Sequence, residues 1–436
     1  MYSIHEEGST AIYRDTVEAV EISVNRDQCL GLVGIQEPPA VSWPEDFREA
    51  FAAPVGSPRL HDLARNAQRV AIIVSDSTRG VPTAKVLPLL LEELDSAGIR
   101  RSDDITVVIA IGVHRAANEE EIREIIGAGN LAGLKVINHD PYDGKQLVAL
   151  GTTSFGTLVE VNRTVYEADL RIAIGKVEPH EFAGFSGGRK SVLPGIAGEK
   201  TIEFNHRPEM LISPAARPGQ LEGNPIHLDM VEAAGMLKIR FMVNLVVNQV
   251  GETIGIFTGD PGASHKAAVG FLRSFCQVSL DQRPDIIVTT PGRPLNINFY
   301  QSVKPLIALA PVMEKGGVLV LYCSCRDGLG TEDMLIPYEG AKDIEAVIGR
   351  LKTDYRIQMD HALLLGKILQ QGIRIVVATP SVDAAILKKI FMIPAANPQD
   401  ALERALKMVN KPKPTVLFLP QAQRALPVFN KTPKSI

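Results

Sequence analysis

The sequence has few of the features that mark secreted or membrane proteins. Its 436 residues contain only four cysteines, Cys29, Cys276, Cys323 and Cys325, and only the last two lie close together. Such sparse cysteines form no disulfide framework, so we expect a reducing, cytoplasmic environment. The opening residues MYSIHEEGSTAIYRD are acidic and polar, unlike a secretory signal peptide. No apolar run is long enough to cross a bilayer, so we expect no membrane association.

An excess of charge of one sign is also missing. The 46 Lys and Arg residues nearly balance the 50 Asp and Glu residues, for a net charge of −4. No basic cluster resembles the electrostatic footprint of a nucleic-acid-binding protein, so we expect no nucleic-acid partner. With 45% hydrophobic and 22% charged residues the composition is that of a globular protein, and disorder is not expected. The length predicts two domains.

Several standard site motifs are absent as well. The chain has no HExxH, no CxxC pair and no carboxylate-rich triad, so we expect no zinc or iron site built only from protein groups. The Walker A spacing GxxxxGK[ST] is missing too. The segment Gly184–Gly188 comes near the nucleophile elbow of hydrolases, but we expect no strand to run directly into Ser186.

What the sequence does have is a regular alternation of strand and helix patterns. Asn118 and Glu121 also predict a capping box at a helix start. Strands alternating with helices predict two α/β domains with mainly parallel sheets and an active site in the cleft between them. We place the domains at residues 1–270 and 271–436, and the last strand could return to the first domain. The β-branched runs expected to form strands are 69–76, 104–112, 134–140, 169–175, 284–292, 316–324, 373–380 and 414–421.

Polar side chains follow four of these predicted strands. Ligands of open parallel sheets bind beyond the carboxyl ends of the strands. The pattern therefore predicts one polar site at the rim of the first sheet, facing the second domain. The residues that follow the strands are Asp76 and Arg79, then His114, then His180, and in the second domain Tyr300, Gln301 and Lys304.

His114 and His180 are the strongest catalytic candidates among these residues. Histidine titrates near neutral pH, so a pair of them can serve as acid and base on opposite sides of a carbon atom. A solvated loop histidine, or one bonded to a backbone carbonyl, is the alternative for each. Their shared position after strand ends favours the catalytic interpretation.

The segment GFSGGRK at 184–190 has two interpretations. Its backbone N–H groups could cradle an anion, or it could be a simple glycine turn. Lys190 could be a phosphate contact, a covalent anchor or a surface charge. Arg79 and Lys304 could bind a carboxylate or phosphate, or could form salt bridges.

Taken together, five motifs resemble the nickel-dependent lactate racemase family. The resemblance runs from about Asp76 to at least Gly330. The motif at residues 178–198 is too long to match by chance. The motifs are DSTRGVP at 76–82, GVHR at 112–115, EPHEFAGFSGGRKSVLPGIAG at 178–198, NH at 205–206 and YQSVK at 300–304.

This resemblance implies a cofactor, nickel(II) held in a pincer nucleotide derived from nicotinic acid mononucleotide. Lys190 would attach the cofactor through a thioamide, and His206 would ligate the nickel. Two sulfur atoms and one ring carbon of the cofactor supply the other three donors, so the protein needs only one. A square-planar set of soft donors suits Ni(II), and it explains why the sequence shows no cluster of ligands.

The resemblance also implies roles for the remaining residues. His114 and His180 would be the acid and base for a 2-hydroxy acid whose Cα hydrogen leaves as hydride. Asp76, Arg79, Ser186, Gly187 and Gly188 would position the cofactor. Arg79, Tyr300, Gln301 and Lys304 would contact the substrate or a phosphate. The implied partners are a small 2-hydroxy acid, lactate or a relative of it, and the enzymes that make the cofactor.

Two other functions remain open from the residues alone. A non-redox dehydratase or hydrolase could use the same histidine pair, and it would be active without nickel. A non-catalytic protein that binds a nucleotide or organic acid would keep its affinity without either histidine. Neither alternative requires both Lys190 and His206, so we favour a racemase or epimerase of 2-hydroxy acids.

Overall fold

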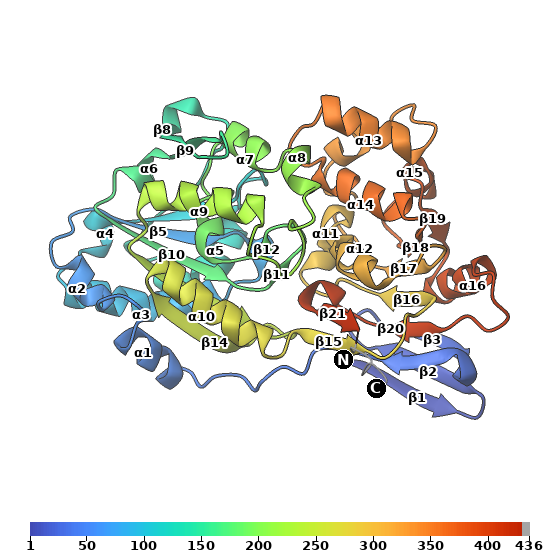
Figure 1. The fold of residues 1–436 in the computed structure, drawn as a ribbon. Helices are drawn as coiled ribbons and strands as arrows, with labels where there is room; N and C mark the ends of the chain where they lie inside the picture. The colour runs from blue at the N-terminus through green and yellow to red at the C-terminus, as the bar shows by residue number, and fades with distance from the viewer. Residues whose placement is uncertain (430–436) are drawn as a thin grey trace, which may run out of the picture. The chain divides into compact units, whose positions relative to one another are not determined.

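A mainly parallel β-sheet forms the centre of each of two units of the chain (Figure 1). The computed structural model describes residues 1–429. The larger unit comprises Glu37–His206 and Ile212–Phe275. The smaller unit comprises Met1–Gln36, Arg207–Leu211 and, among the described residues, 276–429.

The sheet of the larger unit has the strand order β14-β13-β10-β5-β6-β7. All neighbours are parallel except β14, which runs antiparallel to β13. Segments such as Val70–Ser75 are rich in β-branched residues and buried on both faces, as parallel strands require. The strands are β5 (Val70–Ser75), β6 (Ile105–Ala110), β7 (Lys135–Asn138), β10 (Leu170–Lys176), β13 (Phe241–Val247) and β14 (Thr253–Gly259).

Helices cover both faces of this sheet. Apolar side chains of α1 (Glu45–Ala52), α2 (Leu60–Ala64), α3 (Thr83–Ser96) and α5 (Glu119–Ile126) form one core with the even-numbered residues of β5. The helices α9 (Pro225–Leu237) and α10 (Pro261–Arg273) lie over the other face (Figure 1). The shorter elements are α4 (Arg101–Asp104), α6 (Arg163–Tyr166), α7 (Glu199–Asn205), β8 (Leu147–Thr152), β9 (Leu158–Asn162), β11 (Pro179–His180) and β12 (Gly184–Phe185).

The smaller unit has a fully parallel sheet of order β19-β18-β17-β16-β20-β4. Its strands are β4 (Cys29–Leu32), β16 (Ile286–Thr289), β17 (Val318–Tyr322), β18 (Arg374–Ala378), β19 (Ile393–Ala395) and β20 (Val416–Phe418). Its helices are α8 (Pro208–Leu211), α11 (Phe299–Ser302), α12 (Lys304–Leu309), α13 (Ile344–Thr353), α14 (Asp360–Gln370), α15 (Ala384–Lys389) and α16 (Pro398–Met408). A short parallel pair joins β15 (Gln277–Leu280) to β21 (Leu426–Phe429).

The first 36 residues correct the expected domain assignment, because they belong to the smaller unit. β4 is an edge strand of that unit's sheet, paired with β20. An antiparallel sheet of β1 (Tyr2–Glu7), β2 (Thr10–Asp15) and β3 (Val20–Asn25) packs with α16 on the same core. The Tyr13 hydroxyl lies 2.8 Å from that of Tyr322, which donates to Asp15 at 2.9 Å. The last predicted strand, β20, also stays in this sheet and does not return to the larger unit.

The α/β class with two domains and mainly parallel sheets is confirmed, and so is the capping box. Asn118 accepts from the Glu121 amide while the Glu121 side chain accepts from the Asn118 amide, both at 2.9 Å. None of the helices in residues 1–429 combines the length and hydropathy that a membrane span requires. The four cysteines are free thiols.

Candidate active site

The order of the strands places the predicted polar segments at one edge of the larger unit's sheet. β5 lies between β10 and β6, and the three strands are parallel. Asp76 follows β5, His114 follows β6, and the loop that carries His180 and Lys190 follows β10. Because carboxyl ends of parallel strands share an edge, this is the arrangement that the sequence predicted.

Asp76 and His114 form a carboxylate–imidazole pair in which Asp76 is buried and His114 is half-buried. His114 Nδ1 lies 2.8 Å from Asp76 Oδ2, and the other carboxylate oxygen accepts from the Thr78 amide at 2.9 Å. Burial alone would raise the pKa of Asp76, but His114, Arg79 and Thr78 outweigh it and hold that pKa well below its usual range. The ionised carboxylate can only accept, so Nδ1 of His114 carries the proton. The lone pair of the neutral ring is therefore on Nε2, where it can act as a base.

Phe182 lies at the centre of the other predicted side chains. Its ring centroid lies 4.6 Å from that of His180 and 5.0 Å from that of His206, both in edge-on contact. The Lys190 ammonium lies 5.7 Å from the same centroid. Sequence reasoning missed Phe182, and only its position two residues after His180 could have indicated it. The structure thus gathers His180, Lys190 and His206 around one buried aromatic ring.

His180 lies in a small hairpin formed by β11 and β12. Its Nδ1 is 3.3 Å from a carboxylate oxygen of Glu181 and 3.4 Å from the amide of Ala183. An amide can only donate, so a neutral ring that accepts this bond keeps its proton on Nε2. A protonated ring would donate from Nδ1 to Glu181 and would also carry a proton on Nε2. The protonated ring can give up its Nε2 proton and stay a neutral imidazole, so it is the state that can act as an acid.

His206 has the geometry expected of a metal ligand. It follows the last residue of α7 and is only 4% exposed. Its Nδ1 donates to the carbonyl of Ile202 at 2.9 Å, which puts the lone pair on Nε2. Metal-binding histidines commonly make such a bond with their second nitrogen. Across residues 1–429 no group of three or more His, Cys, Asp or Glu side chains could hold a metal, so a metal here needs donors from elsewhere.

The buried carboxylate of Asp229 fixes the turn that carries His206. It accepts hydrogen bonds from the side-chain amide of Asn205 at 2.7 Å and from the hydroxyls of Thr153 and Thr157 at 2.6 and 2.7 Å. The Asp229 side chain is fully buried. Its three donors come from two separate segments, so this carboxylate joins α9 to the end of α7.

We expect Asp229→Ala to lower the free energy of unfolding by about 3 kcal/mol, because it leaves buried donors without an acceptor. Urea denaturation followed by circular dichroism measures the change. Glu232→Ala on the same helix is the matched control, since Glu232 binds the exposed Ser154 and its loss should matter much less. Equal losses in the two variants would contradict the role given to Asp229.

The glycine loop has a conformation that only glycine adopts without strain. Gly187 and Gly188 have φ values of 72° and 53°, and a Cβ on Gly188 would lie 2.8 Å from the ring of His265. The Gly188 amide donates to Asn244 in β13 at 3.0 Å. This packing fixes the path of the chain into the short 3-10 helix Gly188–Ser191, which contains Lys190.

Ser186 is part of the same loop. Its hydroxyl donates to the carbonyl of Lys176 at 2.7 Å and accepts from the amide of Glu178 at 2.9 Å. The two-residue strand β12 runs directly into Ser186, contrary to the expectation from sequence. The hydroxyl nevertheless binds the backbone, as a loop-stabilising group does and a free nucleophile does not. A contact of Ser186 with a cofactor stays a prediction.

The burial of His265 behind the loop predicts a pH dependence of stability. Burial and the nearby Arg189 lower the pKa of His265 from 6.5 to about 3. The unfolded chain then binds this proton more readily, so stability falls as pH drops below about 6.5. We expect His265→Gln to make this decline shallower by about 1.4 kcal/mol per pH unit between pH 6 and 4. Urea titrations at several pH values measure the slopes, and equal slopes would contradict a buried neutral His265.

The predicted substrate residues of the smaller unit lie on two consecutive short helices, α11 and α12. The Tyr300 hydroxyl donates to Asp360 at 2.8 Å, and its ring stands edge-on to His361 with centroids 4.1 Å apart. The side-chain oxygen of Gln301 is buried and has no partner within residues 1–429. Lys304 is the first residue of α12 and is buried. The three side chains thus come from one short stretch after β16, as the YQSVK motif predicted.

Comparison with known proteins agrees with this geometry. The lactate racemase N-terminal domain matches residues 16–219, and the lactate racemase C-terminal domain matches residues 280–423. The chain belongs to the lactate racemase family. Membership of this family confirms the resemblance found in the five motifs and makes the protein an isomerase.

Individual members of the lactate racemase family match over most of the chain. A lactate racemase of Thermoanaerobacterium thermosaccharolyticum is 34% identical over 367 residues, which is 83% of this chain and 85% of that protein. One of Lactiplantibacillus plantarum is 37% identical over 305 residues, 70% of this chain and 71% of that protein. The solved lactate racemase apoprotein of T. thermosaccharolyticum has a TM-score of 0.87 at 30% identity, covering 99% of this chain and 100% of that one.

Proposed function

We propose that this protein interconverts the two enantiomers of lactate with a nickel pincer nucleotide carried on Lys190. The observation that carries the proposal is the gathering of His180, Lys190 and His206 around Phe182. Family membership supports lactate as the substrate. A dehydratase, hydrolase or simple binding protein would need no such grouping of an amine, a proton donor and a metal ligand.

Lys190 and His206 fit the proposed cofactor chemically. The amine of Lys190 is a possible site of covalent attachment, and it follows two glycines that let the backbone approach a ligand closely. The imidazole of His206 presents Nε2 as a ligand, since Nδ1 donates to Ile202. When bound, the nickel pincer nucleotide supplies the hydride acceptor that the protein's own side chains lack. We also propose that Asp76, Arg79, Ser186, Gly187 and Gly188 position it.

The residues of the chain handle the hydroxyl proton of the substrate. His114 Nε2 takes the proton from one enantiomer, and the carboxylate of Asp76 stabilises the resulting imidazolium. A protonated His180 gives its Nε2 proton to the alkoxide and so forms the hydroxyl of the other enantiomer, while it keeps the Nδ1 proton that faces Glu181. In the opposite direction His180 acts as the base and His114 as the acid, so each enantiomer of lactate has its own base.

The carboxylate of lactate needs a cationic partner. Arg79 is half-buried near Asp76, and its side chain makes no hydrogen bond or ion pair within residues 1–429, so we propose it as a carboxylate contact. Arginine binds carboxylates through two parallel hydrogen bonds. We propose Tyr300, Gln301 and Lys304 as further contacts to substrate or to the phosphate of the cofactor. Cofactor-synthesising enzymes of the cytoplasm would be the maturation partners.

The test is the rotation of single-enantiomer lactate by protein co-expressed with a pincer-synthesising system. We expect samples that start as pure L-lactate or pure D-lactate both to become racemic. Circular dichroism measures the loss of optical activity. In deuterium oxide the product should retain its original Cα hydrogen, because the histidines act on the hydroxyl and not on Cα. Deuterium at Cα would contradict the roles of His114 and His180. Activity in nickel-free protein would favour a non-redox enzyme.

A further inference from the structure

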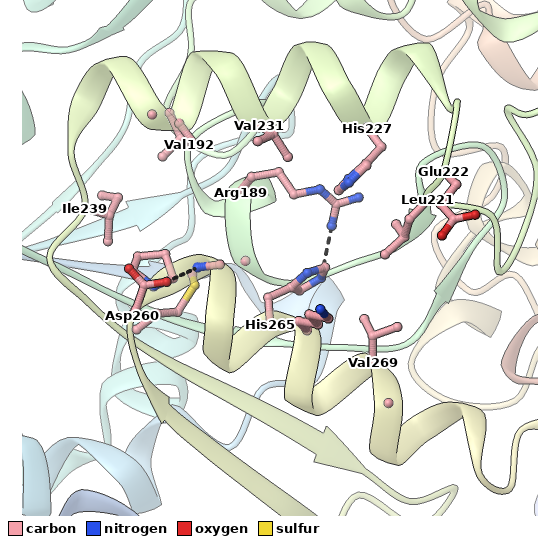
Figure 2. A pocket seen from close by; sticks show the side chains of 18 of the residues that line it. Arg189, Val192, Leu221, Glu222, His227, Val231, Ile239, Asp260, His265 and Val269 are labelled. Atoms are coloured by element: carbon pink, nitrogen blue, oxygen red, sulfur yellow. Dashed lines mark hydrogen bonds between the residues drawn. The ribbon is translucent and has the colours of Figure 1, made fainter. Parts of the chain in front are cut away.

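A cavity lies in the larger unit, between α9 and α10 (Figure 2). Its volume is about 700 Å³, which is within the usual range for sites that bind small molecules. Gly188 and Arg189 form part of its wall, directly before Lys190 in the sequence. None of Asp76, His114, His180, Lys190 and His206 lines it, so it is distinct from the site described above.

Arg189 extends into this cavity without a carboxylate partner. Its side chain is only 6% exposed, and within residues 1–429 it binds only uncharged groups. Its guanidinium donates to the carbonyls of Ala183 at 2.8 Å, Gly187 at 3.3 Å and Ser186 at 3.4 Å, and one of its terminal nitrogens lies 3.2 Å from His265 Nε2. Its Nε–H has no partner. Buried charges in proteins are normally paired, so this arginine lacks a counter-ion.

Two histidines stand on either side of Arg189. Figure 2 shows His227 of α9 and His265 of α10 close to its guanidinium. His227 Nδ1 is buried and has no hydrogen-bond partner. Burial and Arg189 lower the pKa of His227 to about 4, so its ring is neutral at pH 7. Burial lowers the pKa of Arg189 only to about 9, so the guanidinium stays charged.

The acidic residues of the cavity do not neutralise Arg189. Asp260 caps α10, because its carboxylate accepts from the amides of Gly262 and Ala263 at 3.0 and 2.9 Å. Glu222 lies in the wall but is exposed to solvent. Three exposed cations, Lys238, Lys266 and Arg273, also belong to the lining. The cavity therefore favours a negatively charged ligand.

The rest of the wall is apolar. Side chains from both helices and from the neighbouring strand and loops contribute, among them Val192, Leu221, Val231, Ile239, Met242 and Val269. An inorganic anion would leave this surface in contact with water. A ligand with a hydrocarbon body would cover it and gain free energy in proportion to the apolar area that it buries.

We propose that this cavity is a second ligand site that binds a small organic carboxylate with an apolar body. The carboxylate lies against Arg189 and His227, and the apolar body lies between α9 and α10. A carboxylate accepts from Arg189 Nε and from His227 Nδ1, where the neutral ring then carries its single proton. Both are buried nitrogens without a partner within residues 1–429. The inference does not depend on the proposed racemase activity, because neither the cofactor nor His114 takes part in it.

The test is calorimetric titration of the full-length, cofactor-free protein with hexanoate. Hexanamide serves as the neutral probe of the same shape, and inorganic phosphate as the anion without an apolar body. We expect one hexanoate per chain and at least about tenfold weaker binding of hexanamide, because the charged hydrogen bond to Arg189 is lost. Tighter binding of phosphate than of hexanoate, or equal binding of hexanoate and hexanamide, would overturn the proposal.

Variants locate the binding site. Ala234 lines the cavity and Leu228 of the same helix does not, so Ala234→Phe should fill the cavity while Leu228→Phe should not. We expect Ala234→Phe to weaken hexanoate binding at least about tenfold and Leu228→Phe to leave it unchanged. His227→Phe keeps the ring volume without the nitrogen and should weaken binding by about tenfold. Thermal melting checks that each variant is folded.

One further control separates this site from the proposed active site, which would also accept a carboxylate. Arg79 is the proposed carboxylate contact of the active site and does not line the cavity, so Arg79→Ala should leave hexanoate affinity unchanged if the probe binds between α9 and α10. Loss of hexanoate binding in Arg79→Ala, together with normal binding in Ala234→Phe, would place the probe at the active site and overturn the inference. That outcome would leave the racemase proposal intact.

Discussion

Replacing either His114 or His180 by glutamine lowers the rate of lactate racemisation by about a thousandfold, because a positioned acid or base typically accelerates a reaction by a factor of this size. Glutamine keeps hydrogen-bonding capacity but cannot take up a proton. His114 has the geometry of a base, since the ionised Asp76 holds its proton on Nδ1. His180 has the geometry of an acid in its protonated state, since a ring that donates from Nδ1 to Glu181 then carries a second proton on Nε2.

The two directions of the reaction add a constraint to this prediction. The enantiomers of lactate have equal free energies, so kcat/KM must fall by the same factor in both directions for every variant. The loss should appear in kcat, with KM nearly unchanged, because the proton transfer is made in the transition state. Asp76→Asn should lower kcat as well, because an amide can donate to Nδ1 and favour the wrong tautomer.

His61→Gln is the matched control for these variants. His61 lies in α2, where its Nδ1 contacts the hydroxyl of Ser96 at 2.9 Å on the surface. Its replacement should leave both kcat and KM unchanged. Activity of His114→Gln or His180→Gln within about threefold of the parent enzyme would contradict the acid–base assignment.

Replacing His206 by alanine or glutamine removes the nickel while leaving the covalent attachment at Lys190. His206 is the one protein ligand that the proposal gives to the metal, and no other cluster of ligands stands within residues 1–429 to replace it. We expect nickel per chain to fall at least about tenfold. Removing a residue that only hydrogen-bonds a metal ligand already lowers metal affinity by about tenfold, and His206 is proposed as the ligand itself. Elemental analysis measures nickel, and intact mass reports the attachment.

Two variants are needed because His206 is buried and its ring contacts Phe182. Alanine leaves a cavity beside that ring, whereas glutamine fills most of the space without providing an imidazole. Nickel loss in both variants separates ligation from packing. Full nickel content in a folded His206→Gln protein would contradict the ligand assignment.

The sequence was sufficient for the local features of the fold. Buried β-branched runs such as 69–76 form strands because parallel sheets need both faces apolar. Asn118 and Glu121 cap α5 because the two bonds close within three residues. The FMVNLVV run of β13 carries the same signal as 69–76, and we did not predict it. Wherever the interaction is local, the residue types determine it.

Features that depend on distant parts of the chain could not be predicted. Residues 1–36 join the smaller unit because β4 pairs with β20, nearly 400 residues away along the chain, and no local pattern encodes that partner. The pairing of Asp76 with His114 follows from the neighbouring positions of β5 and β6, which only the sheet order reveals. Phe182 was missed because an aromatic residue between two motifs looks like ordinary core.

The same limit applies to the cavity between α9 and α10. Arg189 belongs to the glycine loop, but the groups that surround its side chain, among them His227 and His265, lie in other segments of the chain. A sequence shows that an arginine is present. Only the fold shows whether it has a partner.

The proposed function is tested most directly by the intact mass of the protein after co-expression with a pincer-synthesising system. We expect a covalent adduct on the parent protein that is absent from Lys190→Ala, together with about one nickel per chain in the parent. An unmodified mass and no nickel under these conditions would contradict it. The shared motifs would then serve another use of the fold, and a non-redox enzyme would become the leading hypothesis.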